Sequence, residues 1–141
     1  MSAQDNKALA QRIYQLFSSN RFDEVLSLTT EDVEVVMIPF GQTHHSRAGF
    51  SDFMKGFKDA FPDLQINVTN QVASEDQVVS EFTARGTHTG ILMTPAGAVP
   101  PTGRTVDFTV CEVWRLRDGK LAVLRNYQDA ASLLRQLGLA I

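Results

Sequence analysis

The chain has 141 residues, of which 43% are hydrophobic, and 13 Lys and Arg against 16 Asp and Glu give a formal net charge of −3. A chain of this length can build one hydrophobic core without disulfides or metal, so we expect a single domain over residues 1–141. No run of basic residues is present, which argues against nucleic acid as a partner.

The composition also indicates where the protein works. The first residues contain no apolar signal-like region, and no apolar run approaches the roughly 18 residues that a membrane span requires, so we expect no membrane partner. The lone cysteine, Cys111, has no partner within the chain. A single unpaired cysteine fits a reducing compartment, and we therefore expect a cytoplasmic protein.

Amphipathic helices are expected at three places in the first half of the chain. Apolar residues recur there with the three- and four-residue spacing of a helical stripe. The pattern predicts a helix over residues 3–18, a short helix over Phe22–Leu28, and a third over Phe50–Phe61 that Pro62 ends.

Alternating, β-branched segments predict strands over Asp32–Ile38, Leu64–Val72 and Val78–His88. The polar segment from Gly41 to Gly49 is expected to be a loop. The segment Ile91–Gly103 is rich in Gly and Pro, and we expect it to lack a regular partner and to form a mobile cover over a pocket.

The longest predicted unit is a hairpin over Arg104–Asp129 that turns at Asp118-Gly119. Asp-Gly between β-branched and aromatic runs favours a two-residue turn with positive φ at both positions. That turn would place five pairs on one face: Leu116 with Leu121, Trp114 with Val123, Glu112 with Arg125, Val110 with Tyr127, and Phe108 with Asp129. A three-residue bulged loop would instead shift the register by one.

This mostly apolar face, which carries a few charged groups, resembles the inside of a small-molecule pocket. The residues that we expect to line it from the hairpin are Glu112, Trp114, Tyr127, Phe108 and Val110. Aromatic and sulfur side chains of the earlier segments are expected to complete the lining, although each taken alone is better explained as part of the core: Tyr14, Phe17, Met37, Phe53 and Phe57.

Helices come first, then a run of strands, and a short terminal helix begins at Asp129. This order predicts an α+β fold in which a curved, mixed sheet wraps round the N-terminal helices as a cone that is open at one end.

Five segments, in this order, resemble the SnoaL-like polyketide cyclases of the nuclear transport factor 2-like superfamily. They are Ala60–Leu64, Gly86–Gly90, Pro101–Arg104, Arg115–Lys120, and Asp129 followed by Leu133–Gly138. The resemblance implies the same cone fold, a homodimer, and an intramolecular aldol ring closure on a polyketide ester without metal or organic cofactor.

The resemblance also aligns the acid/base aspartate of the family with Asp129. Asp129 has a second interpretation as the N-cap of the last helix. Arg125 or His88 would stabilise negative charge that develops on the substrate. A cross-strand pair such as Glu112 and Arg125 is, however, more often structural than catalytic, and His88 at the end of a strand could equally hydrogen-bond a turn. His44 and His45 are adjacent and have no third ligand at a suitable spacing, so we expect no metal site.

Two other functions stay open. The run Leu124–Asp129 is similar to one in limonene-type epoxide hydrolases, in which Glu112 would have to supply the second carboxylate. A ketosteroid-isomerase role is less well matched, because Met37–Pro39 occupies the strand of its basic aspartate. Finally, Val123 and Arg125 stand where the cyclases usually carry Glu and Trp, which keeps a non-catalytic ligand binder possible.

Overall fold

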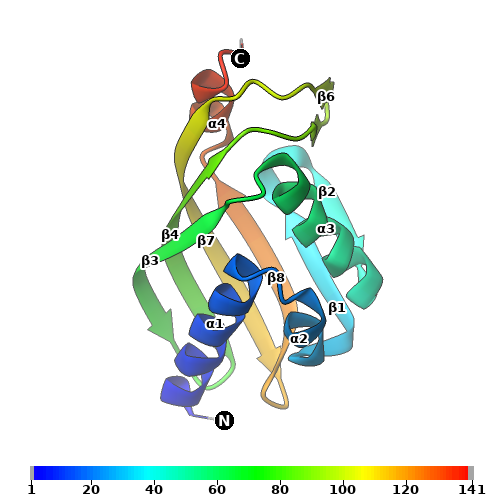
Figure 1. The fold of residues 1–141 in the computed structure, drawn as a ribbon. Coiled ribbons are helices and arrows are strands. Elements are labelled where there is room, and N and C mark those ends of the chain that lie inside the picture. The colour runs from blue at the N-terminus through cyan, green and yellow to red at the C-terminus, as the bar shows by residue number, and fades with distance from the viewer. Residues whose placement is uncertain (1, 140–141) are drawn as a thin grey trace.

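Three helices cover one face of a curved sheet in the computed structural model, which describes residues 2–139 (Figure 1). They are α1 (Ala3–Ser18), α2 (Phe22–Ser27) and α3 (Ser46–Ala60). Helix α1 begins with a capping box between Ser2 and Asp5, which satisfies free amides of its first turn. No helix of residues 2–139 has both the length and the apolarity needed to cross a membrane.

The main sheet has six strands in the order β2-β1-β8-β7-β4-β3, and only the β1–β8 pair is parallel. The predicted α+β fold with a curved, mixed sheet is therefore confirmed. The strands are β1 (Thr29–Met37), β2 (Gln42–His45), β3 (Gln65–Ala73), β4 (Gln77–Thr87), β7 (Thr105–Arg117) and β8 (Lys120–Gln128).

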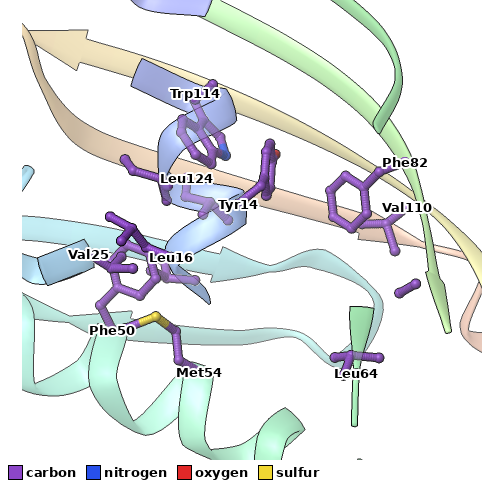
Figure 2. Packing of buried hydrophobic residues seen from close by; sticks show 14 of the residues in the cluster. Tyr14, Leu16, Val25, Phe50, Met54, Leu64, Phe82, Val110, Trp114 and Leu124 are labelled. Atoms are coloured by element: carbon purple, nitrogen blue, oxygen red, sulfur yellow. The ribbon is translucent and has the colours of Figure 1, made fainter. Parts of the chain in front are cut away.

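The core lies between the helices and the inner face of the sheet. Alternate residues of β4 and β7 are buried, as expected for a sheet that is covered on one side. Figure 2 shows the Tyr14 ring of α1 between the rings of Trp114 and Phe82, and both centroid distances are 5.0 Å. These aromatic contacts fix α1 against the middle of the sheet.

The hairpin turn is as predicted, but the register beyond it is not. Asp118 and Gly119 both have positive φ, and Arg117 pairs with Lys120. The register then shifts, because Leu121 and Ala122 are both buried and form a bulge.

The bulge corrects four predicted cross-strand pairs. Downstream of it the side chains of β8 exchange faces relative to the expected register. Glu112 lies opposite Asn126 rather than Arg125, and Trp114 lies opposite Leu124. The bulge is in the strand, three residues after the turn begins, and not in the turn itself.

Two segments that were expected to be irregular contain strands. The polar segment from Gly41 to Gly49 holds β2 and the first turn of α3, which begins four residues earlier than expected. The Gly/Pro-rich segment holds a small hairpin of β5 (Leu92–Thr94) and β6 (Gly97–Val99). The expectation that this second segment lacks a regular partner was wrong, because local antiparallel pairing satisfies its backbone. Its mobility stays a prediction. The chain ends with the short helix α4 (Ala130–Gln136).

The segment after β4 is joined to the end of α3. The backbone amides of Thr89 and Gly90 both donate to the Ala60 carbonyl at 3.1 Å. A Cβ atom at Gly90 would lie 1.8 Å from the Asp59 carbonyl oxygen. Only glycine allows this approach, so it couples the β5–β6 hairpin to the helix that covers the sheet.

We expect Gly90→Ala to lower the free energy of unfolding by more than about 2 kcal/mol, because the new methyl group forces the two backbones apart. Gly56→Ala is the matched control, since a Cβ at this position of α3 meets no atom within 4 Å. It should stabilise the protein by about 0.5–1 kcal/mol through helix propensity. Urea denaturation measures both changes, and equal effects of the two substitutions would contradict the close approach.

Candidate functional site

An apolar pocket lies between the three helices and the inner face of the sheet. It contains about 550 Å³ of empty space, its open mouth included. The apolar lining consists of Ile13, Phe17, Val25, Phe50, Phe53, Met54, Phe57, Leu64, Ile66, Phe82, Ala84, Phe108, Val110 and Leu124, with the rings of Tyr14 and Trp114 beside them.

The carboxylate of Glu112 is the charged group of this lining. Its side chain points inward from the centre of β7, and the residue is only 4% exposed. Tyr14 Oη donates to Oε1 at 2.8 Å and Trp114 Nε1 donates to the same oxygen at 3.1 Å. Asn126 Nδ2 donates to Oε2 at 2.7 Å. Because each carboxylate oxygen has two lone pairs, Oε2 retains one acceptor position.

Burial controls the ionisation of this group. Removal from water raises the pKa of Glu112, while the hydrogen bonds from Asn126, Tyr14 and Trp114 act in the opposite direction without cancelling it. Burial also raises the pKa of Tyr14 well above its usual range, and the neighbouring Glu112 charge adds to this effect. Tyr14 therefore keeps its proton, and Glu112 is a stronger base than an exposed glutamate.

Two buried polar atoms of residues that line the pocket have no hydrogen-bond partner within the described chain. They are Asn126 Oδ1 and Gln128 Nε2, both buried. The two residues alternate on β8 and both line the pocket. An acceptor and a donor are therefore left for a ligand in an otherwise apolar cavity.

Most of the residues expected to line a pocket are in its lining: Glu112, Trp114, Phe108, Val110, Tyr14, Phe17, Phe53 and Phe57. Two others lie elsewhere. Tyr127 is 42% exposed, because the bulge directs it to the outer face of the sheet. Met37 is buried at the end of β1, outside the pocket lining.

The two ionic residues expected on β8 and at its end lie outside the lining. Arg125 is exposed on the outer face of the sheet, opposite Val113. Asp129 is exposed and caps α4, because its carboxylate accepts the Ser132 amide at 3.0 Å. The predicted side-by-side placement of Asp129 and Phe108 is thus not observed. The catalytic roles expected for Arg125 and Asp129 stay predictions.

His88 is fully buried and also lies outside the pocket lining. Its Nδ1 accepts the backbone amide of Thr102 at 3.1 Å, and its ring packs on Phe61 at a centroid distance of 5.3 Å. The accepted hydrogen bond assigns the ring proton to Nε2. His88 thereby joins the end of β4 to the segment after β6. Its expected catalytic role also stays a prediction.

Sequence reasoning missed Asn126 and Gln128. The signal was present, since Leu121–Leu124 is an uninterrupted apolar run in a strand whose neighbours alternate. In such a run a bulge can move the following side chains to the opposite face of the sheet.

Among residues 2–139, no three His, Cys, Asp or Glu side chains converge in a way that could hold a metal ion.

Comparison with known families decides the relationship. The chain matches the SnoaL-like polyketide cyclase family over residues 7–137. It belongs to this family. A search of curated proteins found no match.

Several solved structures share the fold over nearly the whole chain. AclR, a putative hydroxylase from Streptomyces galilaeus, is 28% identical with a TM-score of 0.84, over 99% of this chain and 89% of that chain. IdmH, a putative polyketide cyclase from Streptomyces antibioticus, is 26% identical with a TM-score of 0.79, over 95% and 99%. A putative SnoaL-like polyketide cyclase from Jannaschia sp. CCS1 is 19% identical with a TM-score of 0.87, over 99% and 95%.

Because His88 is buried, we expect the protein to lose stability as the pH is lowered. Burial lowers its pKa from the usual 6.5. Between that value and the lower folded-state pKa the unfolded chain binds more protons, so the free energy of unfolding should fall as the pH is lowered.

Chemical denaturation at several pH values between about 5 and 7 measures this loss. In His88→Gln the part of the slope due to His88 should disappear. His45→Gln, which changes an exposed histidine, should keep the wild-type slope. An unchanged slope in His88→Gln would mean that His88 titrates normally.

Proposed function

We propose that the interior pocket binds an apolar, carbonyl-bearing small molecule and that Glu112 removes a proton from it as a general base. The observation that carries this proposal is the buried carboxylate of Glu112, which faces an aromatic cavity. In an aldol-type ring closure, Glu112 Oε2 would take a proton from carbon next to a carbonyl. The resulting enolate would attack a second carbonyl, and the proton would return to the alkoxide that forms.

The environment of Glu112 supports basic catalysis. Burial raises the pKa of Glu112 and so brings it closer to the higher pKa of a C–H group next to a carbonyl. The smaller difference between the two pKa values makes the carboxylate a more efficient base. The bonds from Tyr14 and Trp114 occupy Oε1 and hold the group still. The free lone pair on Oε2 is the position at which a substrate proton can be accepted.

The enolate oxygen also needs a donor. Gln128 Nε2 is buried without a partner and lines the same pocket, so it is suited to stabilise negative charge on that oxygen. Tyr14 is less suited to donate to the substrate, because its hydroxyl already donates a hydrogen bond to Glu112. Base and donor are both side chains of this chain, so the step requires no further group.

The other candidate functions have less support. Limonene-type hydrolysis would need a second carboxylate at the pocket, and among the residues that line it Glu112 is the carboxylate available. Asp129, the base expected by resemblance, is exposed and occupied as an N-cap. A binder without catalytic activity would use the same cavity, so turnover has to distinguish the two.

A generic probe of a buried base tests the proposal without knowledge of the natural substrate. In 5-nitrobenzisoxazole, removal of the ring C–H proton breaks the N–O bond and gives a coloured cyanophenolate. We expect the protein to catalyse this elimination, with a rate that rises with pH through the raised pKa of Glu112. Glu112→Gln, which cannot accept the proton, should lower the rate at least about 10²-fold.

Asp129→Asn is the matched comparison, because Asn caps a helix about as well as Asp and also cannot act as a base. We expect it to keep the wild-type rate. A loss in Asp129→Asn with full activity in Glu112→Gln would transfer the role to Asp129. Binding of the probe without elimination by the wild-type protein would favour the non-catalytic binder.

A further inference from the structure

The side chain of Asn126 is held in one orientation by the carboxylate beside it. The Asn126 amide donates from Nδ2 to Glu112 Oε2 at 2.7 Å, which is the orientation that an ionised carboxylate requires because it only accepts hydrogen bonds. The Asn126 Oδ1 atom is then directed away from the carboxylate. It is buried, lies in a residue that is 4% exposed, and has no partner in the described chain.

The carboxylate itself cannot easily turn to relieve this atom. Its other oxygen already receives bonds from Tyr14 Oη on α1 and Trp114 Nε1 on β7. Three donors from two strands and a helix therefore fix Glu112, and Glu112 fixes Asn126. The pocket consequently contains a pre-oriented acceptor that cannot change into a donor while Glu112 is ionised.

We propose that Asn126 determines specificity by selecting ligands that carry a hydroxyl group on an aromatic or enolic ring. The hydroxyl would donate to Asn126 Oδ1 and satisfy an atom that is otherwise buried and unpaired. A methyl ether of the same ring would leave the atom unpaired and would bring a methyl group against it. This inference rests on the pocket being the ligand site of the proposed function, but not on Glu112 acting as a base.

Equilibrium binding of a matched pair of probes, 2-naphthol and 2-methoxynaphthalene, tests the inference. The ether is the more apolar molecule, so a pocket without a directed acceptor would bind it at least as tightly. We expect the wild-type protein to bind 2-naphthol at least about 10-fold more tightly in a calorimetric titration. In Asn126→Leu, which keeps the side-chain size and removes this acceptor, the preference for 2-naphthol should fall at least about 3-fold, although Glu112 Oε2 still offers a lone pair.

Two further variants make the result specific. Thr109→Val alters an exposed residue on the outer face of β7 and should keep the full preference. Glu112→Gln replaces the fixed acceptor with an amide that can also donate, which lets Asn126 turn its NH₂ group to the pocket. It should reduce the preference at least about 3-fold, and it serves as the test if Asn126→Leu does not fold by circular dichroism.

Three results would overturn the inference: equal affinity of the wild-type protein for the two probes, an unchanged preference in Asn126→Leu, or no saturable binding of either probe. An unchanged preference in folded Asn126→Leu would point to Glu112 as the acceptor of the hydroxyl. Because binding rather than turnover is measured, the inference can fail while the elimination is observed. The elimination can equally be absent while the hydroxyl preference holds.

Discussion

The burial of one carboxylate at the centre of the sheet is the constraint on which the rest of the pocket depends. Three donors, from Tyr14, Trp114 and Asn126, satisfy its oxygens and favour the ionised form against the cost of burial. These donors come from α1, β7 and β8, so the first helix and both strands of the terminal hairpin must be in place together. The same contacts that make the charge tolerable therefore fix the helix on the sheet and shape the floor of the cavity.

A single extra residue in β8 allows this arrangement. Without the bulge at Leu121 and Ala122, Arg125 and Tyr127 would face the cavity, and Asn126 would lie on the outer face. With it, an amide reaches the carboxylate and Gln128 follows two residues later. Because of the bulge, the cavity is lined by the neutral amides of Asn126 and Gln128 and not by the cationic Arg125. The basicity of Glu112 is thereby set by burial rather than by an ion pair.

The sequence was a good guide wherever a periodic apolar pattern decided the structure. The stripe of α1, the alternation of β4 and the Asp118-Gly119 turn all predicted their elements correctly. It was a poor guide at β2, whose exposed polar residues carry no alternation, and in the register of β8. The register of a strand depends on tertiary contacts, and one bulge shifts it by a residue. The catalytic carboxylate was therefore expected at Asp129, although the carboxylate that lies in the cavity is that of Glu112, which was already named as a pocket residue.

The most direct measurement of this account is the ionisation of Glu112 itself, followed by NMR of protein that carries a ¹³C label in the glutamate side-chain carboxyls. Glu112→Gln identifies the resonance. We expect this one carboxyl to titrate clearly above the usual value of 4.5, because burial raises the pKa of Glu112. A resonance that titrates together with the exposed glutamates would mean that Glu112 is in contact with water. The pocket and the role given to its carboxylate would then both be wrong.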